Sequence, residues 1–210
     1  MSVPVTAFEV LFICTGNLHR SPVAERLLAA VLPEPGFRVR SAGTGARPAP
    51  LDHVTSTVLT ELGGDVRDFT ARPLAAGHVE RADLVLGLER CHREAAVRLC
   101  PLALRRCFTL REFVRLSAGT RAGTPSEAVR LAATRRGEVP PVPGESDGIA
   151  DPHGALPHVH RARALEVRAA VLTLAAILDP AASHHLPGGD DGSPDGFTVA
   201  ERVPSERAAD

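Results

Sequence analysis

The chain has 210 residues, of which 44% are apolar and 23% charged, and its formal net charge is −1. This composition is typical of a globular protein, and no apolar stretch approaches the roughly 20 residues that cross a bilayer, which excludes a membrane segment. The chain has no basic stripe interleaved with aromatic residues, so the sequence gives no indication of nucleic-acid binding.

Short apolar segments alternate with helical patterns along the first half of the chain. Strands are predicted at residues 8–14, 37–41, 82–88 and 107–110, and helices from residue 22 onward, at residues 51–62 and at residues 89–99. This alternation favours right-handed crossovers and a parallel sheet that is covered on both sides. We therefore expect an α/β fold, a three-layer sandwich with a central four-stranded parallel sheet.

The pattern is weaker after the fourth predicted strand. Residues 126–136 predict an amphipathic helix, residues 137–148 a proline-containing loop, and residues 157–178 the longest helix. Residues 179–210 hold seven acidic residues and two arginines among many Pro, Gly and Ser, a composition typical of disorder. We expect one domain over residues 1–178 and a disordered acidic tail over residues 179–210. The first residues show no secretory signal pattern, so we also expect a cytoplasmic protein.

The segment between the first predicted strand and the first helix carries the chemistry, and we call residues 14–20 the anion loop. Cys14 ends the strand and Arg20 opens the helix. Parallel sheets bind ligands at the carboxyl ends of their strands, and unpaired N–H groups at a helix N-terminus attract anions. The same positive field favours a thiolate at Cys14, and Arg20 can present a planar fork to two phosphoryl oxygens. The pattern predicts attack by a thiolate on a bound tetrahedral oxyanion.

Asn17 is the only asparagine of the chain and lies inside the anion loop. A tight turn around an anion requires backbone at positive φ, which glycine adopts freely and asparagine better than most residues, so we expect positive φ at Gly16 and Asn17. Ser21 can donate its hydroxyl to the thiolate of Cys14, and Pro22 suits the first turn of a helix. A nucleotide-binding loop of the G-x-x-x-x-G-K-S/T type is excluded, because the chain has no lysine.

The anion loop and its flanks resemble the signature C-x-G-N-x-x-R-S-P of the low-molecular-weight protein tyrosine phosphatases. Further matches follow at residues 41–44 (SAGT), 82–86 (ADLVL), 108–113 (FTLREF) and 151–154 (DPHG). The resemblance extends over roughly residues 8–178. It implies the fold described above and the hydrolysis of a phosphomonoester in two steps, with no metal or other cofactor.

The resemblance also implies the role of each catalytic residue. Cys14 would attack phosphorus and form a phosphocysteine, while Arg20 and the loop amides stabilise the phosphoryl oxygens. Asp151 would protonate the leaving oxygen and then activate water to release phosphate. The expected partners are a phosphorylated protein or a small phosphomonoester, with phosphate or another oxyanion in the anion loop.

The remaining family positions bind the phosphoryl group or support the loop. Ser21 belongs to the first class, and Asn17 and Ser41 are expected to hydrogen-bond within a network that holds the loop. The residues of the anion loop that are expected to contact substrate are Thr15, Gly16, Asn17, Leu18 and His19.

Several positions bear on the substrate because they differ between branches of the family. His19 stands where many members carry a second cysteine that forms a reversible disulfide with the nucleophile. Arg47 and His153 stand where aromatic residues usually wall the cleft, so stacking on a phenyl ring is weakened and a more polar phosphomonoester becomes an alternative to phosphotyrosine. Leu18 agrees with the tyrosine-type members, since related protein arginine phosphatases tend to have threonine there.

Three other functions fit parts of the pattern: a phosphatase of a sugar or nucleotide phosphate, a thiol-dependent arsenate reductase, and a phosphate-binding module without turnover. The reductase needs two further redox cysteines, but Cys100 and Cys107 lie on the wrong elements for it. We predict that these two and Cys91 pack in the core. The histidines indicate no metal-ligand set, because His158 and His160 point to different sides of a helix. Nucleophile and acid are both retained, which argues against the binding module.

Overall fold

The computed structural model describes residues 7–32, 35–141, 143 and 146–180. Its strands are β1 (Phe8–Cys14), β2 (Phe37–Gly43), β3 (Leu84–Gly87) and β4 (Cys107–Thr109). Its helices are α1 (Arg20–Val31), α2 (His53–Glu61), α3 (Ala76–Arg81), α4 (Arg90–Leu99), η1 (Pro101–Arg106), α5 (Leu110–Ser117), α6 (Pro125–Arg135) and α7 (Pro157–Leu178). The predicted acidic tail lies outside the described residues from residue 181 onward.

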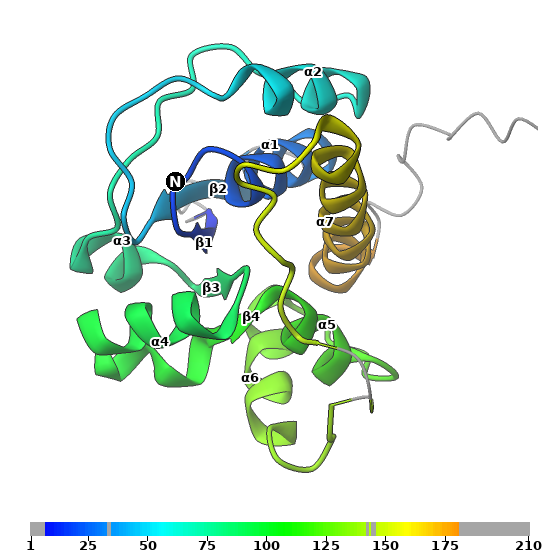
Figure 1. Ribbon diagram of the computed structural model, residues 1–210. Helices are drawn as coiled ribbons and strands as arrows, with labels where there is room; N and C mark the ends of the chain where they lie inside the picture. Colours follow the sequence, from blue (N-terminus) through cyan, green and yellow to red (C-terminus); the bar gives the residue numbers. More distant parts are fainter. Residues whose placement is uncertain (1–6, 33–34, 142, 144–145, 181–210) are drawn as a thin grey trace, which may run out of the picture.

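The four strands form one parallel sheet in the order β2-β1-β3-β4. Because successive side chains of a strand point to opposite faces, Val10 and Phe12 of β1 enter the larger core cluster, while Leu11 and Ile13 enter the smaller one. Figure 1 shows α1, α2 and α7 on one side of the sheet and α3 and α4 on the other. The prediction of a three-layer α/β sandwich with four parallel strands is therefore confirmed.

The last helix follows the prediction residue for residue. It runs over Pro157–Leu178 and buries Val167, Val171 and Leu174 against the larger core cluster. The chain that enters it passes close to α1 (Figure 1), which brings residues 147–153 toward the anion loop. Among the described helices, none combines the length and the apolar character that crossing a bilayer requires.

Helix α5 was not predicted, and the strand predicted over residues 107–110 is one residue too long, because Leu110 begins this helix. The Thr109 hydroxyl accepts from the N–H of Glu112 at 3.1 Å, and the Glu112 carboxylate accepts from the N–H of Thr109 at 3.0 Å. This reciprocal capping box satisfies two free N–H groups and favours a helix over a longer strand. The short elements α3 and η1, which carry little apolar periodicity, were also absent from the prediction.

Candidate active site

The anion loop joins the carboxyl end of β1 to the start of α1. Cys14 is buried, and its Sγ lies 3.2 Å from the backbone nitrogen of Asn17 and 2.9 Å from Oγ of Ser21. An N–H group and a hydroxyl are thus within hydrogen-bond distance of the sulfur, and both can donate to a thiolate. The structure brings together the predicted nucleophile and two of the residues expected to support it.

The backbone of the loop differs from the expectation at one position. Asn17 has a φ of 52°, in the left-handed region as predicted. Gly16 does not: the described glycines with positive φ are Gly63, Gly119, Gly137 and Gly154. A Cβ at Gly16 would meet only the Leu18 side chain, at 3.9 Å. The prediction for Gly16 is wrong because the single left-handed residue Asn17 is enough to turn the loop.

The side-chain amide of Asn17 is hydrogen-bonded at both of its ends. Its Oδ1 accepts from the backbone N–H of Arg72 at 2.9 Å, and since a backbone nitrogen can only donate, this contact fixes the orientation of the amide. Its Nδ2 then donates to Oγ of Ser21 at 3.0 Å and to Oγ of Ser41 at 2.7 Å. Each hydroxyl oxygen accepts from Asn17, so each hydroxyl keeps its own proton for another acceptor.

The two hydroxyl protons have different acceptors. Ser21 faces the sulfur of Cys14, and Ser41 donates to the buried carboxylate of Glu25. Burial raises the pKa of Glu25, while the hydrogen bond from Ser41 and the charge of Arg72, 3.8 Å away, oppose that rise. A hydroxyl proton aimed at the sulfur stabilises a thiolate, so this chain of hydrogen bonds suits the predicted role of Cys14.

The end of β2 approaches the anion loop very closely. The N–H of Gly45 donates to the carbonyl of Thr15 at 3.0 Å. A Cβ at Gly43 would lie 2.5 Å from that carbonyl oxygen and 2.9 Å from the backbone nitrogen of Asn17. Only glycine can occupy position 43 without displacing the loop.

Arg20 is buried beneath the site, with its side chain 1% exposed. One terminal nitrogen donates to the carboxylate of Glu89 and to the carbonyl of Ile149, the latter at 2.8 Å, and the other donates to Oδ2 of Asp151 at 2.5 Å. Its Nε has no hydrogen-bond partner in the described part of the chain. Two carboxylates therefore hold the guanidinium: the predicted acid Asp151, and Glu89, which the sequence analysis missed.

The segment that carries Asp151 is fixed to the sheet and to α5. Ile149 donates its N–H to the carbonyl of Leu88, just beyond β3, at 2.8 Å. Arg115 of α5 donates to both carboxylate oxygens of Asp147, at 3.1 and 2.7 Å. These contacts bring Asp151 to Arg20 although the two lie 131 positions apart in the chain.

His92 is a second residue that the sequence analysis missed. It is 1% exposed, and its Nδ1 accepts from the backbone N–H of Glu89 at 3.0 Å. The proton of the neutral ring therefore sits on Nε2, which lies 3.0 Å from Oγ1 of Thr15. Burial, together with the charge of Arg20, lowers the pKa of His92 to about 4, so the ring is neutral at physiological pH. His92 thus holds one side of the anion loop.

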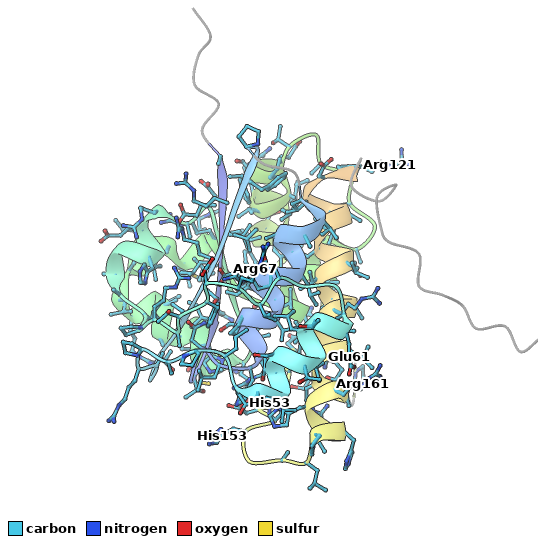
Figure 2. The ribbon with its side chains drawn as sticks, turned by 90° about the horizontal axis from the view of Figure 1, so that it is seen from above. His53, Glu61, Arg67, Arg121, His153 and Arg161 are labelled. Atoms are coloured by element: carbon cyan, nitrogen blue, oxygen red, sulfur yellow. The ribbon has the colours of Figure 1, made fainter. Side chains whose placement is uncertain are left out.

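Imidazole rings gather beside the anion loop. Nδ1 of His19 lies 2.7 Å from Oγ1 of Thr55, and its ring lies 4.9 Å from that of His160 and 5.8 Å from that of His153. Burial and the neighbouring His160 lower the pKa of His19. Figure 2 shows His53 and His153 at the same end of the molecule. Two of the positions that depart from the family pattern, His19 and His153, therefore lie next to each other.

The other residues predicted to contact substrate form few hydrogen bonds or ion pairs with the rest of the described protein. Leu18 is half-buried within the loop, and Thr15 is exposed apart from its contact with His92. Arg47 is exposed in the segment after β2, and no hydrogen bond or ion pair joins it to another described residue. The structure therefore gives no hydrogen bond or ion pair between Arg47 and the other described residues of the predicted site.

Two groups of side chains have ligand atoms within 4.8 Å of one another: His19, Asp52 and His160, and Glu89, Cys91 and His92. The sequence indicated no ligand set for the histidines, because residues far apart in the chain form the first group. Asp52 already accepts from two N–H groups at the start of α2, and Glu89 already pairs with Arg20.

The remaining cysteines separate into two environments. Cys100 and Cys107 are buried in the smaller core cluster, as predicted. Cys91 is exposed, so its prediction as a core residue is wrong: it stands on the solvent side of α4, next to the buried His92. Burial raises the pKa of Cys107 to about 11, which makes it a poor nucleophile.

Comparison with known families gives the same assignment as the geometry of the loop. The sequence profile described as "Low molecular weight phosphotyrosine protein phosphatase" matches residues 9–126, which include the anion loop, strands β2 to β4 and all of β1 except Phe8. The chain belongs to this family. The matched region ends before Asp151, so the match does not bear on the predicted role of that residue.

Relatives within the family carry two kinds of name. The probable low molecular weight protein-tyrosine-phosphatase AmsI of Erwinia amylovora is 38% identical over 94 residues, 44% of this chain and 64% of AmsI. The protein-arginine-phosphatase of Geobacillus stearothermophilus is 33% identical over 128 residues, 60% of this chain and 86% of that protein. The solved YwlE arginine phosphatase from the same organism superposes with a TM-score of 0.64 at 28% identity, covering 85% of this chain and 97% of that one. The match spans slightly less than two thirds of AmsI.

The close approach at Gly43 predicts that Gly43→Ala weakens binding of orthophosphate in the anion loop. Displacing one N–H from the anion costs on the order of 1.5–3 kcal/mol, so the dissociation constant measured by calorimetry should rise about tenfold or more. Gly45→Ala is the matched control, since its Cβ would meet Thr15 only at 3.9 Å. Equal affinities in Gly43→Ala and wild type would show that β2 does not shape the loop.

The neutral, buried His92 predicts a pH dependence of stability. Its pKa is about 4 in the folded protein against an ordinary 6.5, so the unfolded chain binds more protons between these values and stability falls as the pH drops through that window. From pH 7 to pH 5, the free energy of unfolding in urea should fall about 2 kcal/mol further in wild type than in His92→Gln, which cannot titrate. Parallel losses in both proteins would contradict the buried neutral ring.

Proposed function

We propose that this protein hydrolyses phosphomonoesters through a phosphocysteine intermediate, in the manner of a protein tyrosine phosphatase. The observation that carries the proposal is the environment of Cys14, a buried sulfur with the N–H of Asn17 at 3.2 Å and the hydroxyl of Ser21 at 2.9 Å. Arg20 closes the same loop and supplies a permanent positive charge. These groups support a thiolate and bind an oxyanion at one place.

In the first step, the sulfur of Cys14 forms a bond to phosphorus while the bond from phosphorus to the leaving oxygen breaks. Arg20 and the loop N–H groups bind the phosphoryl oxygens, over which the charge is spread in the transition state. Asp151 gives its proton to the leaving oxygen. The products are a phosphocysteine and a neutral alcohol or phenol.

In the second step, Asp151, now a carboxylate, takes a proton from water as the water oxygen attacks phosphorus. The sulfur of Cys14 leaves as a thiolate, and orthophosphate is released. Ser21 stabilises this leaving thiolate, because Asn17 donates to its oxygen and leaves the hydroxyl proton free for the sulfur. The same hydrogen bonds therefore serve the nucleophile in one step and the leaving group in the next.

The contact between Arg20 and Asp151 couples substrate binding to acid catalysis. In this contact, the second terminal nitrogen of Arg20 lies 2.5 Å from Oδ2 of Asp151. A phosphoryl dianion in the loop competes with the carboxylate for the same guanidinium. We propose that substrate thereby displaces the Asp151 carboxylate from Arg20, while Glu89 keeps Arg20 in place. The displaced carboxylate takes up a proton from solvent, and this is the proton that it gives to the leaving oxygen in the first step.

The mouth of the site favours a second candidate, the hydrolysis of a small polar phosphomonoester. Arg47 and His153 stand at the positions where a phenyl ring would need an aromatic wall, and the ring of His153 lies 5.8 Å from that of His19. Leu18 and the relatives named tyrosine phosphatases favour phosphotyrosine, and the relatives named arginine phosphatases add phosphoarginine as a further protein-bound substrate. Arsenate reduction is disfavoured, because burial raises the pKa of the Cys107 thiol to about 11.

Replacing the acid should affect poor leaving groups most. In Asp151→Asn, kcat for phenyl phosphate should fall by roughly 10²–10⁴, the usual contribution of a general acid, and should fall less for p-nitrophenyl phosphate, whose phenolate leaves without a proton. Steady-state kinetics with both substrates checks this, and Cys14→Ser should abolish turnover of either. Equal losses for the two leaving groups would remove Asp151 from the role of acid.

The same kinetic assay separates the two candidate functions. Phosphotyrosine and phosphoarginine peptides are compared with sugar and nucleotide monophosphates by kcat/KM. A protein phosphatase turns over the peptides faster. Equal or faster turnover of the small monophosphates would replace the protein-phosphatase assignment by the second candidate.

A further inference from the structure

A pocket of about 310 Å³ lies at the edge of the sheet, outside the anion loop. Its lining is dominated by charged and basic side chains, and we call it the arginine pocket: Arg38, Arg40, Arg72, Arg81, His78 and Glu9. These residues come from β2, from the segment before α3, from α3 itself and from β1. None of them belongs to the anion loop.

The pocket follows from the alternation of side chains along the edge strand β2. Phe37 and Val39 pack against the larger core cluster, so Arg38 and Arg40 point to the opposite face and are exposed. On that face α3 is only six residues long and packs inward through Val79. The outer face of β2 is thereby left to the two arginines.

Positive charge exceeds negative charge in the lining. Glu9 is its only carboxylate, and the ion pair from Arg40 to Glu9 measures 4.0 Å, at the limit of such contacts. Arg38 and Arg81 form no hydrogen bond or ion pair with another described residue. Their guanidinium groups are free to bind an anion.

The surroundings of Arg72 and His78 also indicate an excess of positive charge in the arginine pocket. Nε of Arg72 is buried and has no hydrogen-bond partner among the described residues, and the pair from Arg72 to Glu25 measures 3.8 Å. His78 is half-buried, and its pKa is lowered by burial first and then by the charges of Arg81, Arg72 and Arg40. Three guanidinium groups that act on one imidazole indicate a positive potential that the neighbouring carboxylates do not cancel.

We propose that the arginine pocket binds a compact polyanion, such as a diphosphate or a small bisphosphate. Guanidinium groups from three separate segments can each present two donors to phosphoryl oxygens. Leu11 is the only apolar side chain of the lining, and no Phe, Tyr or Trp is part of it, so the lining favours a charged ligand over an apolar one. The volume lies at the lower end of the roughly 300–1,000 Å³ of small-molecule sites, which suits a ligand without a large organic part.

The arginine pocket adjoins the network that holds the anion loop. Ser41 lines the pocket and also accepts from Asn17 at 2.7 Å. The backbone N–H of Arg72 donates to the Asn17 side chain at 2.9 Å, and its carbonyl accepts from Gly43 at 3.0 Å. Cys14, by contrast, belongs to the core cluster on the other face of the sheet. The two anion sites are therefore distinct but share supporting residues.

Calorimetric titration with methylenediphosphonate, a diphosphate analogue that cannot be hydrolysed, tests the proposal on the full chain. Wild type should bind it, and the dissociation constant should rise about tenfold or more in the double variant Arg38→Ala/Arg81→Ala. Each lost hydrogen bond to a charged group costs on the order of 1.5–3 kcal/mol. Both residues are exposed and outside the catalytic machinery. The inhibition constant of orthophosphate against p-nitrophenyl phosphate should be the same in both proteins.

The matched control removes two other exposed arginines, in Arg121→Ala/Arg130→Ala. Figure 2 shows Arg121 at the end of the molecule opposite His53 and His153, and Arg130 lies on α6. This variant has the same net charge as the pocket variant and should bind methylenediphosphonate like wild type. The proposal is overturned if the two variants lose affinity equally, if neither does, or if the pocket variant weakens diphosphonate and orthophosphate in parallel. The titration needs no turnover, so its failure is separate from failure of the proposed hydrolysis.

Discussion

The hydrogen bonds of the Asn17 side chain set the polarity of the whole site. The backbone N–H of Arg72 fixes the amide, so its two N–H groups must donate to Ser21 and Ser41. Glycine at position 17 would permit the left-handed φ of 52° but would lose the donors, and aspartate would reverse both hydrogen bonds. Asparagine alone satisfies the backbone and the polarity together, which explains why the one asparagine of the chain stands there.

Charge balance around Arg20 is the second constraint. A buried guanidinium is costly unless it is paired, and Glu89 and Asp151 supply the pairing from two distant parts of the chain. Glu89 is also held by His92 through its backbone N–H, so the anchoring of the cation and the anchoring of Thr15 converge on the start of α4. These contacts hold the loop by hydrogen bonds within the protein itself, an arrangement that suits the proposed electrostatic catalysis.

The sequence predicted those elements and site residues that are encoded by residues close together in the chain. The four strands, the last helix and the anion loop depend on neighbours in the chain, so apolar runs and one signature revealed them. Glu89, His92 and the backbone of Arg72 act across long separations, and no local pattern marks them. The predictions for Gly16 and Cys91 were wrong for a different reason, because each was based on residue type alone. Glycine suggested a positive φ at position 16, but Asn17 is left-handed and turns the loop by itself. Cysteine suggested a core position for residue 91, but this side chain lies on the solvent side of α4.

The rate of Cys14 alkylation by iodoacetamide near neutral pH tests the central claim most directly, because the thiolate is the reacting species. Ser21→Ala and Asn17→Gly should each slow it about tenfold, the effect of one lost hydrogen bond to a charged group, and the double variant should be no slower than either. Glycine keeps the left-handed backbone at position 17, so the change isolates the amide. Losses that add in the double variant, or an unchanged rate in Asn17→Gly, would show that the amide does not direct the Ser21 proton to the sulfur.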